Sequence, residues 1–273
     1  MSKAIITLLL FVISTGFTSI DAQSINAQIL NEKNSQPIEF ANIGIPLKNA
    51  GTVSDEDGYF KLDIKNDMLN DTIVISCIGF YSLTIPVKSL FVDEIIRLFL
   101  KEKVTTLSDI HVKPTKFKEK KLGIKGLRKF VSGFSENQLG YECGILFKNK
   151  KRAFLKSVTI NIATCSYDSL FYRLNVYEVQ NELDFLNILM KPIYINIPRE
   201  KINSSITVPL EEYNIVTNGN FIVTLEHVKD LGKGHLYFAS APLQTTYYRK
   251  TSHGQWEKVL IGVGISVNAD VEL

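Results

Sequence analysis

The chain has few of the residues that most often carry catalysis. Its 273 residues include three Cys and four His, and His111, His227, His235 and His253 form neither an H-x-x-E nor an H-E-x-x-H motif. A peptidase zinc site is therefore not expected. The sequence also lacks the G-x-S-x-G motif of serine hydrolases, and no Cys lies in a recognisable nucleophile motif. We predict no enzyme, no metal site and no cofactor.

Strong charge of either sign is also missing. The net charge is +3 at pH 7, with 22% charged residues, so composition indicates no acidic partner. A nucleic-acid-binding surface would need a denser, clustered basic face with stacking aromatic side chains, and none is predicted. The scattered carboxylates Asp168, Glu178 and Asp184 have no spacing typical of a glycosidase, although an unrecognised hydrolase stays a minor alternative.

Long apolar runs are absent after residue 22, so no membrane-spanning segment is expected. Residues 1–22 contain the cation Lys3, a short apolar stretch, Ala4–Val12, and the small residue Ala22 before Gln23. This order is typical of a cleaved signal peptide. No Cys follows the predicted cleavage site, so a lipid anchor is not expected.

Three Cys residues cannot complete a set of disulfides. Cys77 has the same strand parity as Ile73 and Ile75, which predicts a buried free thiol. Cys143 and Cys165 could pair in an oxidising compartment, but sequence spacing does not set the geometry that a disulfide requires. The pairing is left open.

The strongest pattern present is alternation of apolar and polar residues with a period of two. It predicts strands with one face on a core, and no long segment has a helical period. In residues 23–112 the predicted strands lie at Ile25–Leu30, Ile38–Leu47, Gly51–Ser54, Tyr59–Ile64, Thr72–Ile78, Tyr81–Val87 and Glu94–Leu100. Turn residues separate these short strands, which favours an antiparallel sandwich.

The acidic stretch before Gly58 has two interpretations. Asp55 and Asp57 resemble ligands of a calcium loop, but such a loop needs a Glu six residues after its glycine, where Ile64 stands. Asp-Gly between alternating segments is instead typical of a β-hairpin turn. We predict the hairpin.

A family resemblance follows from these residues. Gly51-Thr-Val-Ser-Asp-Glu-Asp-Gly-Tyr-Phe60, followed by Ser76-Cys-Ile-Gly-Phe80, resembles the carboxypeptidase regulatory-like domain. The resemblance implies a non-catalytic, prealbumin-like Greek-key sandwich, found in proteins of the Gram-negative envelope, including nutrient receptors of the outer membrane. The residues after 112 are too few for the plug and barrel of such a receptor.

Residues 113–138 are rich in Lys and Arg and are predicted to form a basic linker. Attraction of this segment to anionic lipid, and hence peripheral contact with a membrane, is the alternative to a simply solvated segment. Residues 139–273 again alternate. Eight strands are predicted there, at Phe154–Ala163, Leu170–Val179, Ile193–Ile197, Ile206–Leu210, Phe221–His227, His235–Ser240, Thr245–Arg249 and Lys258–Val271, which fits a jelly-roll-like sandwich.

Aromatic side chains are the candidate ligand-binding residues of this second domain. Trp256 follows His253-Gly254 and is predicted to be exposed near a loop, while Tyr177, Tyr247 and Tyr248 are further candidates. Such rings stack on sugars, although core packing explains a ring equally well.

The sequence thus predicts an all-β chain with a signal peptide at 1–22, a regulatory-like sandwich at 23–112, a linker at 113–138 and a jelly-roll-like sandwich at 139–273. The predicted function is that of an exported, non-catalytic accessory or adhesion protein of a Gram-negative envelope, in the periplasm or at the cell surface, that binds a glycan or a protein. A purely structural spacer is the main alternative. The oligomeric state is not predicted.

Overall fold

The computed structural model describes residues 23–91, 95–103 and 116–273. The all-β prediction is confirmed, because twenty strands and only four short 3-10 helices make up this part of the chain. None of the helices in these three ranges is long and apolar enough to cross a membrane. The predicted signal peptide, residues 1–22, lies outside the described residues.

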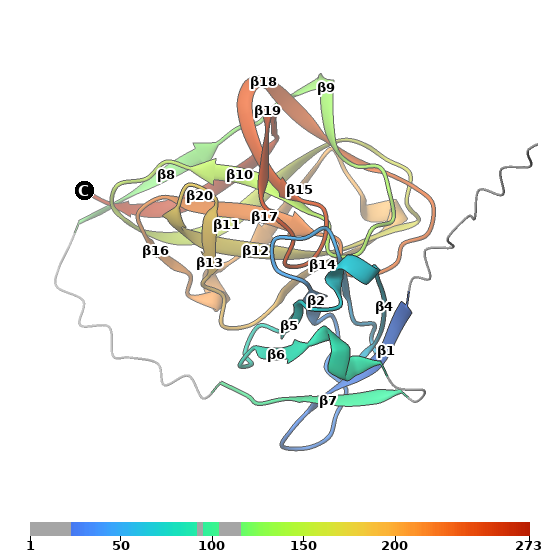
Figure 1. Ribbon diagram of the computed structural model, residues 1–273. Coiled ribbons are helices and arrows are strands. Elements are labelled where there is room, and N and C mark those ends of the chain that lie inside the picture. Colours follow the sequence, from blue (N-terminus) through green and yellow to red (C-terminus); the bar gives the residue numbers. More distant parts are fainter. Residues whose placement is uncertain (1–22, 92–94, 104–115) are drawn as a thin grey trace, which may run out of the picture.

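The N-terminal domain is a sandwich of two small sheets (Figure 1). One sheet has the order β4 (Tyr59–Ile64), β1 (Gln23–Asn31) and β7 (Ile96–Leu100). The other has the order β3 (Gly51–Val53), β2 (Asn42–Gly44), β5 (Thr72–Ser76) and β6 (Leu83–Pro86). All pairs are antiparallel except β1 with β7, which is parallel.

Alternation along the strands builds the core of this sandwich. In β4, Phe60, Leu62 and Ile64 are buried while the residues between them are exposed. They pack with Ile25, Ile29, Ile43, Ile73 and Ile75 from the other strands in one apolar cluster.

The Asp55–Gly58 segment is a turn, but the predicted hairpin is wrong. Gly58 has φ +77°, and the Asp55 carboxylate accepts bonds from the backbone N–H groups of Asp57 (3.0 Å) and Tyr59 (2.8 Å). However, β3 pairs with β2, whereas β4 pairs with β1. The turn therefore carries the chain from one sheet to the other, a distinction that local turn signals cannot make.

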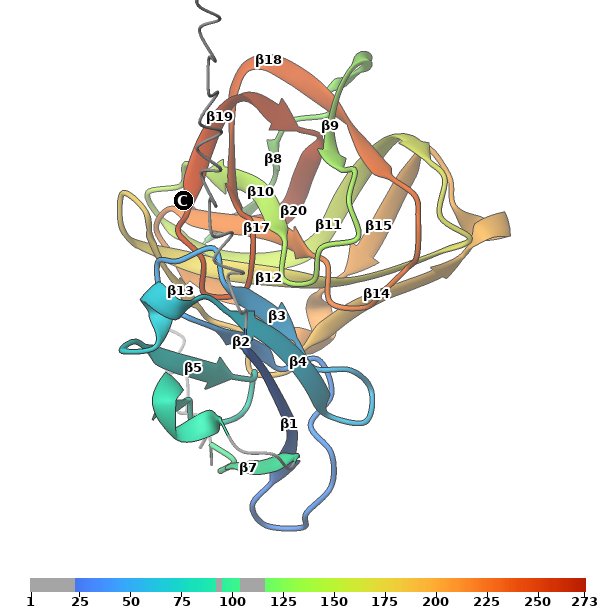
Figure 2. The ribbon, with the colours of Figure 1, turned by 45° about the vertical axis from the view of Figure 1, so that its right-hand side comes forward.

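The C-terminal domain is a larger β-sandwich (Figure 2). Its strands follow the order β13-β12-β17-β10-β18-β11-β20-β8, with β9, β14, β15, β16 and β19 paired at the sides. The bounds are β8 Phe117–Gly123, β9 Leu127–Phe134, β10 Glu142–Phe147, β11 Arg152–Cys165, β12 Ser169–Asn181, β13 Asp184–Asn187, β14 Ile193–Pro198, β15 Ser205–Pro209, β16 Val216–Asn218, β17 Phe221–Glu226, β18 Leu236–Arg249, β19 Glu257–Val263 and β20 Ile265–Glu272. The two ends of β11 have different partners: Ile160 pairs with Ile265 of β20, and Ile162 pairs with Phe238 of β18.

Two sequence predictions for residues 113–273 are wrong in detail. The basic segment is not a linker between residues 117 and 134, because β8 pairs with β20 and β9 pairs with β18. The predicted strand Lys258–Val271 is divided into β19 and β20 at Gly264. The pairing partners of β8, β9 and β20 lie far away in sequence.

The two sandwiches touch along the outer face of the β12-β17-β10-β18 sheet. Phe40 and Val53 of the first domain pack with Val228 of the second in a small apolar cluster. The backbone of Leu47 donates a hydrogen bond to the carbonyl oxygen of His253 (3.0 Å). Glu56 and Lys229 form an ion pair across the rim of this interface (2.7 Å).

Candidate functional site

Four charged side chains stand in one row across the sheet that faces the N-terminal domain. In the strand registers Arg173 of β12 is opposite Glu226 of β17, Glu226 is opposite Glu142 of β10, and Glu142 is opposite Arg249 of β18. The row therefore reads plus, minus, minus, plus, and its formal charges cancel. Arg173, Glu226 and Glu142 are buried, and the Arg249 side chain is only 12% exposed.

Glu226 links the two domains. One of its carboxylate oxygens accepts bonds from Arg173 Nη2 (2.7 Å) and from the Asn175 side chain (2.8 Å), and the other accepts a bond from Asn42 of the N-terminal domain. Arg173 also donates to the backbone carbonyl of Phe40 (2.6 Å) and to Asn42. Buried charge at this contact is thus paired with groups of both sandwiches, as burial requires.

Glu142 is held entirely by the C-terminal domain. Its carboxylate accepts bonds from Arg249 Nε (2.8 Å), Tyr177 Oη (2.8 Å), Asn175 (2.9 Å) and Thr224. The Asn175 amide therefore bridges both glutamates.

The protonation states follow from these contacts. Burial alone would raise the pKa of Glu226, but Arg173 and Arg249 hold it below its ordinary value. Burial raises the pKa of Tyr177 well above its ordinary value, so this phenol keeps its proton and donates to Glu142. Burial also lowers the pKa of His253 to about 4. At neutral pH Glu226 is ionised and His253 is uncharged.

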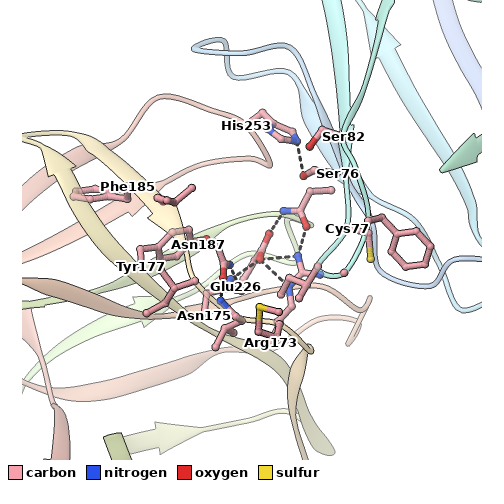
Figure 3. Close-up of a pocket in the computed structure, with 18 of the residues that line it drawn as sticks. Ser76, Cys77, Ser82, Arg173, Asn175, Tyr177, Phe185, Asn187, Glu226 and His253 are labelled. Atoms are coloured by element: carbon pink, nitrogen blue, oxygen red, sulfur yellow. Dashed lines mark hydrogen bonds and ion pairs between the residues drawn. The ribbon is translucent and has the colours of Figure 1, made fainter. Parts of the chain in front are cut away.

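A pocket of about 570 Å³ opens beside this network, between the domains (Figure 3). The N-terminal domain contributes Ser76, Cys77, Phe80, Ser82 and Lys103. The C-terminal domain contributes the polar floor and an apolar wall, made of Arg173, Asn175, Tyr177, Phe185, Leu186, Asn187, Ile188, Leu189, Met190, Glu226, Arg249 and His253. Neither domain alone forms this pocket.

The floor and wall of the pocket are held in fixed positions. Asn187 donates to the Asn175 oxygen (3.1 Å) and accepts from the backbone N–H of Leu189 (2.9 Å). His253 Nε2 lies 3.2 Å from Ser76 Oγ, across the domain boundary. The Phe185 ring packs edge-on against Trp256, with 5.2 Å between centroids. A ligand would thus meet a prearranged set of amides and hydroxyls together with the aromatic rings of Phe80, Tyr177 and Phe185.

The four aromatic candidates have different environments. Tyr177 lines the pocket. Trp256 was predicted to be exposed, and this is wrong: only 9% of it is accessible, because it packs on Tyr177 and Phe185 and under the Arg249 guanidinium. Tyr247 is half-buried against Phe185, and Tyr248 is half-buried with its hydroxyl bonded to Glu257 (2.8 Å). Trp256 and Tyr247 thus support the pocket wall from behind.

The cysteines are free thiols. Cys143 is buried and Cys165 half-buried, and no disulfide joins them. Cys77 is half-buried rather than buried, since it lies on the pocket wall.

Sequence patterns did not single out the charge row. Arg173, Asn175 and Tyr177 do share one parity of β12, and Tyr172, Leu174 and Val176 share the other and lie in the core. Alternation along this strand predicts one core face and one polar face, and it does not indicate what covers the polar face. A second domain covers it, and no local pattern records that contact.

The carboxylate pair does not have the properties of a hydrolase. An acid catalyst needs a raised pKa, and a water-activating partner needs room for the water. Here the pKa of Glu226 is lowered, and both carboxylates accept bonds from buried arginines. Their oxygens share the Asn175 amide, which occupies the space between them.

Comparison with known proteins supports the assignment of the first domain. Residues 25–112 match the CarboxypepD_reg-like domain, which covers less than half of the chain. This domain is regulatory and non-catalytic, and no catalytic family is indicated. A search of curated proteins finds no match.

Proposed function

We propose that this protein is an exported, non-catalytic binding protein of the Gram-negative envelope and that its ligand is a carbohydrate held in the pocket between the two sandwiches. The observation that carries the proposal is the pocket itself, which is built by both domains and has a volume within the range of small-molecule sites. Export is supported by the signal-like residues 1–22.

Most of the lining suits a ligand rich in hydroxyl groups. The guanidinium groups of the floor are paired with Glu226 and Glu142, and Lys103 is a lining cation that forms no ion pair with another described residue. The amides of Asn175 and Asn187 and the hydroxyls of Ser76 and Ser82 are the group types that bond sugar hydroxyls. Phe80 and Phe185 add apolar ring surface, which suits the CH face of a sugar.

The rim of the pocket also points to binding. Leu186 and Met190 are both about half exposed beside the opening, although each is a large apolar side chain. Apolar groups gathered at the mouth of a pocket are typical of a contact surface.

A glycan array probed with the purified protein tests the proposal. We expect selective binding that Phe185→Leu and Asn187→Ala each weaken by about tenfold or more, since each removes a group from the lining. Phe99→Leu is the matched control, because Phe99 is exposed on β7 and does not line the pocket. Absence of any glycan binding, or equal loss in the control, would contradict the proposal.

A rigid spacer is the second candidate. It is favoured by the buried pair Arg173–Glu226, whose bonds to Phe40 and Asn42 fix the first domain on the second without any ligand. A spacer would bind nothing on the array, and the pocket variants would then have no binding to lose.

A further inference from the structure

Parts of β9, β18 and β19 form the end of the C-terminal sandwich that points away from the N-terminal domain (Figures 1 and 2). Several large apolar side chains of these strands are exposed. We call this end the distal tip and define it by the β8–β9 turn with the start of β9 (residues 124–131), the irregular part of β18 (242–244) and β19 residues 258–261. The exposed fractions are 85% for Leu243, 71% for Leu260, 54% for Leu127, 43% for Val131 and 40% for Val259.

The three segments of the distal tip lie side by side. In the strand registers Ser240 pairs with Leu127, and Pro242 pairs with Ile261. A Cβ placed on Gly262 would lie 2.5 Å from both Ile124 Cδ1 and Gln244 Cβ, which shows how closely the turn, β18 and β19 approach. The apolar side chains therefore belong to one surface.

Leu243 is the most unexpected residue of this surface. It has φ +60°, a backbone conformation that favours Gly or Asn, and it lies where β18 and β19 change register. Neither burial nor backbone preference explains a leucine there. Such a residue is a reason to look for a function.

The surroundings of the apolar surface are cationic. Lys121, Lys125, Arg128 and Lys129 are all exposed, and none of them forms an ion pair with another described residue. Three acids lie nearby and are engaged: Glu182 pairs with Lys258, Glu257 with Lys250, and Glu119 accepts a bond from Asn268. These cations thus lie in the same stretch of chain as the exposed Leu127 and Val131.

We propose that the distal tip docks on an anionic phospholipid bilayer. Leucine side chains of the tip would enter the region between headgroups and acyl chains, and the lysine and arginine side chains would lie against lipid phosphates. The charge complementarity favours this partner over a neutral surface. Docking by this end would direct the N-terminal domain and the inter-domain pocket away from the bilayer, and it does not depend on what the pocket binds.

Sedimentation of the full chain with vesicles tests the proposal. Vesicles of phosphatidylcholine alone are compared with vesicles that also contain phosphatidylglycerol. We expect binding only to the second kind, weakened by added salt because the phosphate contacts are screened. The variant Lys125→Gln/Arg128→Gln should bind roughly 30-fold more weakly, since each cation near an anionic surface contributes on the order of 1 kcal/mol.

The apolar part of the tip is tested separately. Leu243→Ser/Leu260→Ser should weaken binding by about tenfold or more, because two buried side chains are lost from the bilayer. The matched controls are Leu47→Ser, an exposed leucine of the N-terminal domain that does not line the pocket, and Lys33→Gln/Lys88→Gln, two exposed lysines of the same domain. Both controls should bind like the unchanged protein.

Three results would overturn the proposal. Equal binding to both kinds of vesicle would exclude recognition of anionic lipid. Unchanged binding of Leu243→Ser/Leu260→Ser would mean that the lysine and arginine side chains alone hold the protein on the vesicle, without insertion of the leucines. Failure to bind vesicles, together with self-association that the leucine variant abolishes, would make the tip a contact between copies of this chain.

Discussion

A few buried charged side chains lie where the two sandwiches meet, and the stability of this contact depends on their charge states. Glu226 and Glu142 stand opposite each other on neighbouring strands, where like charges repel. Each is stabilised by an arginine on its outer side, so the pair is tolerable only while the whole row is intact. His253 lies beside this row in its neutral form.

His253 should make folding stability depend on pH. Its pKa in the folded protein is about 4, against 6.5 ordinarily, because burial and Arg249 disfavour its charged form. As the pH falls through this interval the unfolded chain binds a proton that the folded chain does not. The contribution of His253 to the free energy of unfolding is therefore complete above about pH 6.5. It is lost as the pH falls towards 4, by up to about 1.4 kcal/mol per pH unit.

Urea unfolding at a series of pH values measures this effect. His253→Asn should flatten the decline in the free energy of unfolding between pH 6.5 and pH 4. Asn also tolerates the positive φ (+58°) at this position. His235→Asn, outside the interface, should leave the decline as it is. An equally steep decline in the His253 variant would show that this residue is not its source.

Among the secondary-structure elements, β2 and β3 set how closely the domains approach. Gly44 of β2 and Gly51 of β3 face the loop that carries Ser252, and a Cβ on either glycine would overlap the Ser252 carbonyl. The backbones are therefore in direct contact. This closeness lets Asn42, in the same strand as Gly44, reach Glu226.

Gly44→Ala should consequently push the 251–254 loop away and weaken the inter-domain contacts. We expect a loss of about 1–3 kcal/mol in the free energy of unfolding, the usual range for overpacking. Gly232→Asn is the control, because Gly232 has open space around it and Asn tolerates its positive φ. Equal stability of Gly44→Ala and the unchanged protein would mean that the interface can shift without loss.

On the scale of the whole molecule, the two sandwiches share buried contacts and should unfold as one unit. Domains joined only by exposed polar contacts usually move and unfold separately. Here the shared contacts include the buried Arg173–Glu226 pair with Asn42 and the exposed Lys229–Glu56 pair. The Arg173–Glu226 pair is buried beneath the interface and bonds to Asn42, whereas the Lys229–Glu56 pair crosses the interface at its exposed rim.

Calorimetry should thus record one transition for the unchanged protein and two for Arg173→Met. Removal of Arg173 leaves the Glu226 charge poorly compensated, at a cost of about 3–5 kcal/mol. Lys229→Met, the matched control, removes an exposed pair and should cost less than about 1 kcal/mol. Similar curves for the two variants would contradict a cooperative role for the buried pair.

The amino-acid sequence alone was enough to predict where the strands of the first domain lie, although the predicted strand Ile38–Leu47 is shorter in the structure, at Asn42–Gly44. In β4 the alternation of Phe60, Leu62 and Ile64 with polar residues is a local property, and it survives in the structure unchanged. The turn at Gly58 was predictable for the same reason, since a positive φ is a property of one residue.

Only the tertiary structure decided which strands pair and which polar faces meet. The basic segment became β8 and β9 because β20 and β18, distant in sequence, present free edges to it. Arg173, Glu226, Glu142 and Arg249 come from four separate strands, and strand register alone brings them into one row. Pairing and domain contact are interactions between distant segments, and alternation within one strand carries no information about them.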